Sequence, residues 1–228
     1  VPYQSAGNGT INQNGTELST KNSSQSTEVK SSVDLLFIKE INKKNSLSFN
    51  AVWTGIFTDR TDTNHEEKIS NKEVVFSDKV VQDLKKNSLI LQADYEHTFE
   101  SPSQLSLGYR YYGAKLNSIV TNSFFENKPS VTTQNNHSLY GDFSYKLGQV
   151  NLSLKGTLDY LHSNYYGARQ SSLSPQVYLN AKYIIDKHNA LRLRTSYTYY
   201  ESQLGSHAEN MRYLEQYILY RGNPNLKP

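Results

Sequence analysis

The most constraining feature of this sequence is a strict two-residue alternation of apolar and polar side chains, repeated in run after run from about residue 31. Alternation with this period is the pattern of a β-strand with one apolar and one polar face. We count about eight such runs, the first being the least regular. They lie at 33–41, 47–57, 89–95, 105–111, 139–147, 150–160, 177–185 and 191–199. The sequence therefore predicts an all-β, antiparallel fold.

Short and long connections alternate between these runs. Turn-forming residues predict tight turns at 42–45, 101–103, 146–149 and 186–189. Polar composition predicts long loops at about 61–86, 117–136, 163–173 and 204–226. Short turns on one side and long loops on the other are typical of an outer-membrane barrel. We interpret the chain as an antiparallel transmembrane β-barrel segment with short periplasmic turns and long extracellular loops.

The start of the chain has a different composition. Residues 1–30 are rich in Asn, Gly, Ser, Thr and Gln, which predicts a polar loop. The predicted organisation is therefore a polar loop at 1–30 followed by a partial β-barrel segment at 31–228.

Two loop segments are predicted to be helical. Lys79–Leu84 has the composition for a turn or two of helix. Ser206 and Glu209 have the spacing of a capping box. Apolar residues after it fall on one helical face, so a short helix is predicted at about 207–219.

Composition limits the alternatives. Apolar residues make up 36% of the chain, below the roughly 45–50% of an ordinary globular domain, so a soluble core would be thin. The 18 tyrosines suit a surface that is apolar on one side and wet on the other. No run approaches the ~20 apolar residues of a transmembrane helix, whereas alternating barrel strands leave only a weak hydropathy signal. A net charge of +3 gives no indication of nucleic-acid binding.

The sequence shows no catalytic constellation. Its six histidines are scattered, without the spacing of a metal site. Nucleophile-elbow, phosphate-loop and dinucleotide motifs are absent. Asp94 and Glu96 share a strand face, but a solvated polar face explains them better than an acid–base pair. We therefore predict no enzyme activity, no catalytic residue, no cofactor and no metal ligand.

The polar strand faces carry charges of both signs. In a barrel such residues line the wet lumen, where they either contact a plug or solute or only solvate the wall and fix strand register. The candidate lumen-lining residues are Asp94, Glu96, Arg110, Asp142, Lys155, Asp159, Lys182, Arg192 and Arg194.

The most specific motif lies at the end of the chain. It consists of Gly222, Asn223, Pro224, Asn225, Leu226, Lys227 and Pro228. This motif resembles the signature of TonB-dependent receptor barrels, and most of all the outer-membrane β-barrel family common in Bacteroidetes. The runs on either side of the 186–189 turn, and the hairpin at 31–50, are similar to the family's pattern. The stretch at 202–206 departs from it, because the family's arginine–proline-rich segment is missing. The motif is predicted to be structural, since Asn and Gly favour turns and Pro fixes φ.

The resemblance implies a fragment of a larger barrel of about 22 strands around a plug, in the bacterial outer membrane. A complete small barrel of eight strands is the rival architecture. The implied partners are outer-membrane lipid, the plug domain of the same full-length chain, a TonB-type energy-coupling protein that acts through a region N-terminal to this chain, and an unknown small solute.

The implied function is energy-coupled uptake of a scarce solute, such as an iron chelate, a vitamin-like cofactor, or a peptide or glycan fragment. Tyr213, Tyr217 and Tyr220, in the loop before the signature, are candidate solute contacts. The alternatives are a structural or adhesive outer-membrane barrel and a soluble β-rich binding module.

Overall fold

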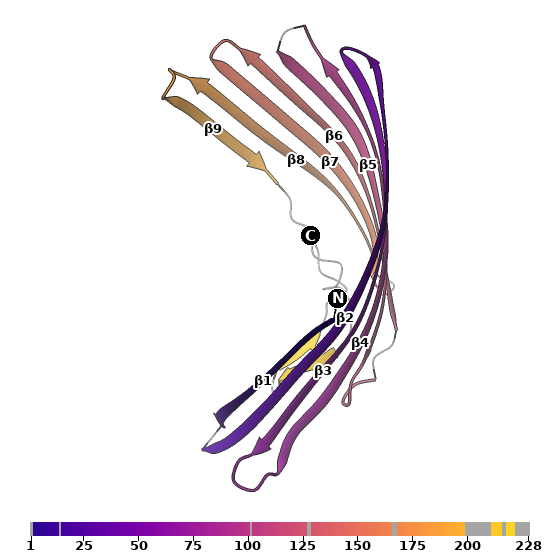
Figure 1. Cartoon of the computed structure of the whole chain (residues 1–228), viewed down its shortest axis with the longest axis vertical. Helices are drawn as coiled ribbons and strands as arrows, with labels where there is room; N and C mark the ends of the chain where they lie inside the picture. Colours follow the sequence, from indigo (N-terminus) through magenta and orange to yellow (C-terminus); the bar gives the residue numbers. More distant parts are fainter. Residues whose placement is uncertain are drawn as a thin grey trace.

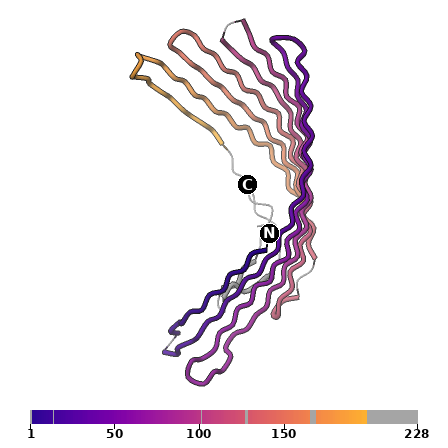
Figure 2. Tube along the Cα trace, in the orientation of Figure 1, coloured from indigo at the N-terminus to yellow at the C-terminus, as the bar shows by residue number. Residues whose placement is uncertain are grey.

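A single antiparallel sheet dominates the structure. The computed structural model describes residues 2–13, 15–100, 102–126, 129–165, 168–198, 211–215 and 218–221. Nine strands pair in chain order, and two further strands form a separate pair. Figures 1 and 2 show the large sheet as one curved, twisted layer. The strands are β1 (Pro2–Gln13), β2 (Thr16–Asn42), β3 (Asn45–Lys68), β4 (Val74–Thr98), β5 (Ser103–Thr121), β6 (Ser130–Leu147), β7 (Val150–Tyr165), β8 (Ala168–Ile184), β9 (Ala190–Tyr197), β10 (Met211–Glu215) and β11 (Ile218–Arg221).

The eight predicted strands correspond to β2–β9, and the antiparallel all-β prediction is confirmed. The described sheet is open, because β1 and β9 do not pair with each other, and it is not a closed barrel of eight strands. β1 covers only the Thr16–Thr27 part of β2, so the rest of that edge has no described strand beside it. Within the described residues, no helix is long and apolar enough to cross a membrane.

The four predicted tight turns are confirmed, and they lie along one edge of the sheet, at the top of Figures 1 and 2. In the β2–β3 turn, the Asn42 side chain accepts a hydrogen bond from the Lys44 backbone N–H at 2.9 Å. In the β6–β7 turn, Gly148 takes a left-handed φ of 54° that favours glycine. These local interactions reverse the chain within a few residues and set each hairpin's register.

The long-loop predictions at 61–86, 117–136 and 163–173 were wrong. Most of these residues continue β3–β8, and the connections shrink to 69–73 between β3 and β4, 122–129 between β5 and β6, and 166–167 between β7 and β8. Alternation in the sequence indicates a strand only where one face of that strand is apolar and the other is polar. These strand ends gave no such signal because both of their faces are polar or mixed. The ladder of backbone hydrogen bonds continues without that signal. The fourth predicted loop, 204–226, lies mostly outside the described residues.

Three further predictions were wrong for the same reason. Residues 2–13 and 16–30 are not a loop but a paired hairpin, β1 with β2. Lys79–Leu84 is not helical but part of β4, where Val80 is buried. The helix predicted at 207–219 was wrong where the structure describes it, because residues 211–215 and 218–219 belong to the short strands β10 and β11. Polar composition and short apolar spacings are weak signals, and pairing with a neighbouring strand overrides them.

The strand register divides the sheet into two faces. Residues directly opposite each other on paired strands point to the same side, and side chains alternate along each strand. We call one side the Asp94 face and the other the Leu154 face, after one member of each. With the exception of Ser103, every buried side chain in the described strands lies on the Asp94 face.

Candidate functional site

The Leu154 face carries a continuous apolar belt across β2–β9. One row of directly paired residues crosses six strands: Leu47, Tyr95, Leu107, Gly141, Gly156 and Val177. The belt is exposed, with 45% of Leu154 and 60% of Leu193 open to the surroundings. On β3 it runs from Leu47 to Phe57, which matches the ~9–11 residues that a tilted strand needs to cross a bilayer. A large exposed apolar surface of this kind requires lipid or protein against it.

Aromatic clusters border the belt at both ends. Near the tight turns, the His97, Phe99 and Phe143 rings contact one another in sequence, with centroids 4.4 and 6.4 Å apart. At the other end, His137 lies among three tyrosine rings, of which Tyr109 and Tyr111 have centroids 6.2 and 5.2 Å away. Amphipathic rings prefer the boundary between hydrocarbon and water. Two such girdles around an apolar band are typical of transmembrane barrels.

Beyond the second girdle the two faces exchange character. On β3 the Leu154 face becomes polar from Asp59 to His65. The Asp94 face becomes buried and gains apolar side chains, with Leu18, Phe76 and Val80 only 2–7% exposed among buried polar residues such as Asp78. β2, β3 and β4 therefore extend well past the belt, at the lower end of Figures 1 and 2. These strand extensions, and not long loops, produce the asymmetry that the sequence indicated.

All nine candidate lumen-lining residues lie on the Asp94 face. The register links them from strand to strand: Asp142 is directly opposite Lys155, and Lys182 is opposite Arg192. The face also carries their uncharged partners, such as Gly108 opposite Asp94. The structure thus brings these residues together on the face of the sheet opposite the apolar belt. We call this part of the Asp94 face the charged wall. Whether they line a lumen stays a prediction.

Two carboxylates on this wall are held by hydrogen bonds. Asp94 accepts from the Tyr140 hydroxyl and, at 2.8 Å, from the Gln92 amide. Asp159 accepts from the Ser138 hydroxyl and, at 2.8 Å, from the Gln176 amide. Neutral donors therefore stabilise both negative charges. For Asp94 they come from its own strand and from β6, and for Asp159 from the two adjacent strands, β6 and β8. The sequence reasoning missed these four donors, Tyr140, Gln92, Ser138 and Gln176. It considered only charged residues, and the sequence does not show the strand register that places neutral residues beside them.

The positive charges on this wall have a different environment. In the part of the chain that the structure describes, none of the nine residues forms an ion pair. Lys182, Arg192 and Arg194 form a basic cluster, in which Lys182 and Arg192 are directly opposite each other. Like charges in opposite positions destabilise a sheet. Within the described strands, the register places no carboxylate directly opposite any of these three residues.

Other predicted residues are not placed by the structure. Tyr213 and Tyr220 belong to β10 and β11, whose side chains are not described, and Tyr217 lies outside the described residues. The signature from Gly222 to Pro228 also lies outside them. Among the described residues, no three His, Asp or Glu side chains form a group able to hold a metal ion.

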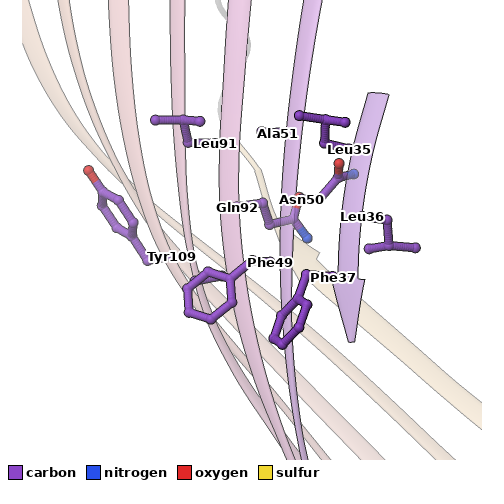
Figure 3. Close-up of a pocket in the computed structure, with 10 residues that line it drawn as sticks. Leu35, Leu36, Phe37, Phe49, Asn50, Ala51, Leu91, Gln92 and Tyr109 are labelled. Atoms are coloured by element: carbon purple, nitrogen blue, oxygen red, sulfur yellow. The ribbon is translucent and has the colours of Figure 1, made fainter. Parts of the chain in front are cut away.

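The belt is not flat. Figure 3 shows Leu35, Phe37, Phe49, Leu91 and Tyr109 grouped around a depression of about 510 Å³ on the Leu154 face. A second groove of about 710 Å³ crosses from β3 to β8 and shares Ala93 and Tyr109 with the first. Both are lined mostly by apolar atoms.

A known protein family matches nearly the whole chain. Residues 2–228 match the family described as TonB dependent receptor-like, beta-barrel. No curated protein sequence matches the chain. Among solved structures, the chain is similar to the ferripyoverdine receptor of the outer membrane of Pseudomonas aeruginosa bound to ferripyoverdine, with 10% identity and a TM-score of 0.39. That match covers 81% of this chain and 39% of the receptor, so the chain spans about two-fifths of the receptor's length.

The family match covers nearly the whole chain and includes the belt, the girdles and the charged wall. It excludes the soluble β-rich module that the sequence left open, because the family's barrels lie in the outer membrane. This chain belongs to the TonB dependent receptor-like β-barrel family, and its location is the bacterial outer membrane.

Proposed function

We propose that this chain forms part of the barrel wall of a receptor that takes up a scarce solute in an energy-coupled way. The observation that carries the proposal is the family match over residues 2–228. The strand register supports it, because all nine candidate lumen residues share the face opposite the membrane belt.

The physical argument starts from the size of the barrel. A barrel of about 22 strands is too wide for side chains to fill, so its lumen needs a plug. A plugged pore does not pass solute by diffusion, and moving the plug requires work. Since the outer membrane has no nucleotide supply, that work would come from the inner membrane through a TonB-type coupling protein. The plug would belong to the same full-length chain and would lie against the Asp94 face. The solute is an iron chelate, a vitamin-like cofactor, or a peptide or glycan fragment. We expect no catalysis.

Uptake and growth on limiting nutrients test this proposal. The strains to compare are the wild type, a deletion of the full-length gene, and a strain without the coupling protein. We expect the deletion and the coupling-deficient strain to show the same defect. Complementation with Arg192→Gln/Arg194→Gln should restore uptake less well than complementation with Lys187→Gln, a matched change in the β8–β9 turn. Uptake that survives loss of coupling, or a deletion without any nutrient defect, would contradict the proposal.

An adhesive barrel is the second candidate function. Its supporting observation is the extension of β1–β4 beyond the belt, where β1 is exposed along nearly its whole length. Such a surface is rich in Ser, Thr and Asn and offers many hydrogen-bonding groups. A deletion that lowers adherence to host or matrix material without any nutrient defect would favour this function.

A further inference from the structure

The groove between β3 and β8 lies within the membrane belt. Its two walls are adjacent rows of directly paired residues on the Leu154 face. One is the row of Leu47, Tyr95, Leu107, Gly141, Gly156 and Val177; the other contains Ala93, Tyr109, Leu139, Leu158 and Pro175. The volume of about 710 Å³ is within the range of small-ligand sites. Because strands flank the groove on both sides, it is not a product of the open edges of the sheet.

A pair of glycines leaves open space in the groove. Gly141 and Gly156 are directly opposite each other on β6 and β7. A Cβ atom at Gly156 would have no neighbour within 4 Å, and one at Gly141 would meet only the Leu107 side chain at 3.1 Å and a backbone oxygen at 3.7 Å. Neither glycine has a positive φ, so backbone conformation does not require them. Glycine weakens a strand interior and often marks a place where a ligand approaches closely. The space is open to the belt and is not filled by the described chain.

The groove has a defined entrance. Leu47, at one end, lies near the start of β3, next to the turn that carries Lys43 and Lys44. Val177, at the other end, begins the 177–185 alternating run on β8 and lies away from the tight-turn edge. The groove therefore runs from the tight-turn rim into the belt. Lys43 is exposed at this rim, whereas Lys44 pairs with Glu100 at 2.8 Å. A lysine at the membrane boundary attracts an anionic headgroup.

We propose that this groove binds one acyl chain of a phospholipid, with the phosphate of that lipid near Lys43. The groove is continuous with the membrane-facing belt, is apolar along its length, and opens at a rim that carries positive charge. In a barrel with periplasmic tight turns, that rim lies in the leaflet made of phospholipid. The occupant is a lipid tail and not a second copy of the chain. This inference does not depend on which solute is transported.

Photolabelling of the folded, full-length protein tests the proposal. The protein is reconstituted in vesicles of phosphatidylethanolamine and phosphatidylglycerol, with a trace of phosphatidylglycerol that carries a diazirine near the end of one acyl chain. After irradiation, labelled peptides are mapped by mass spectrometry. We expect the label to concentrate at 139–141 and 156–158, compared with the belt residues at 191–193, although Leu191 and Leu193 are more exposed than Leu158. Even labelling around the belt would overturn the proposal.

Variants sharpen the test. Gly156→Leu should fill the groove, so label at 139–141 should fall to the level of the rest of the belt. Ala181→Leu is the matched control, because it adds bulk on the same face outside the groove, and it should leave the label unchanged. Gly156→Ala, which adds one methyl group without a clash, should give a partial loss in a protein that folds normally. Unchanged labelling in both Gly156 variants would contradict the proposal. Disulfide-linked dimers formed through Leu158→Cys would also contradict it, by placing a second copy there.

Discussion

The Tyr140 hydroxyl donates a hydrogen bond to Asp94 across an intervening strand. Tyr140 is on β6 and Asp94 on β4, and Gly108 on β5 is directly opposite both. A Cβ atom at Gly108 would overlap the Tyr140 ring and an Asp94 carboxylate oxygen. The missing side chain at position 108 is what lets the tyrosine reach the carboxylate, and the contact ties three strands of the charged wall together.

This relationship predicts coupled effects of two substitutions. Tyr140→Phe should lower the free energy of unfolding by about 1 kcal/mol, because Asp94 keeps only the Gln92 donor. Gly108→Ala should break the same hydrogen bond by displacing the ring. In a double-mutant cycle measured by urea unfolding in vesicles, the two losses should therefore be less than additive. Tyr112→Phe, on the same face, is the control. Full additivity would show that the contact does not stabilise the wall.

Arginine substitutions should distinguish the two faces. Leu154→Arg places a charge in the membrane belt and should cost about 2–4 kcal/mol. Ser153→Arg, one residue earlier, points to the Asp94 face and should cost much less. Folded yield in outer membranes, measured by heat-modifiable electrophoretic mobility, should fall far more for the first variant. Equal yields would mean that the register is shifted, since a slip of one residue exchanges the faces.

The two ends of the sheet should lie on opposite sides of the membrane. We predict that the 69–73 connection is extracellular and that the β8–β9 turn is periplasmic. In the full-length protein, a cysteine at Asn71 should react with an impermeant thiol reagent on whole cells, and a cysteine at Lys187 should react only after lysis. The reverse result would invert the topology and remove the argument for phospholipid in the groove.

The β8–β9 turn should weaken at low pH. Asp186 accepts hydrogen bonds from the backbone N–H groups of His188 and Asn189 and from the Asn189 side chain. The Asn189 side chain, followed by these backbone donors, holds the Asp186 pKa below its usual range. The folded pKa is thus below the ~3.9 of an unfolded Asp. The stabilisation is present above that value and is lost as pH falls through the folded pKa. The unfolding midpoints of the wild type and of Asp186→Ala are measured from pH 7 to pH 2. The difference between the two midpoints should be smaller at the acid end. A constant difference would contradict this role.

Much of the membrane-spanning part was predictable from the sequence, because lipid on one side and polar surroundings on the other force a two-residue period. The tight turns were predictable from residues such as Asn42 and Asp186, whose side chains bond the local backbone. The strand extensions were not, since neither β1 nor the distal half of β3 alternates between apolar and polar. The nine candidate lumen-lining residues could be identified from the sequence, because they are charged and lie at the polar positions of the alternating strands. Their neutral partners, including Tyr140, became visible only when register placed β4 and β6 on either side of Gly108.

The most direct test of the account is the environment of successive residues along β7. Nitroxide spin labels are placed one at a time at positions 150–160 of the reconstituted full-length protein. Collision rates are then measured with oxygen, which partitions into lipid, and with a water-soluble nickel chelate. We predict a two-residue period, with oxygen maxima at even positions such as Leu154 and Leu158, and nickel maxima at odd positions such as Lys155 and Asp159. Profiles that rise and fall together, or that show no alternation, would contradict the claim that this sheet separates membrane from a wet interior.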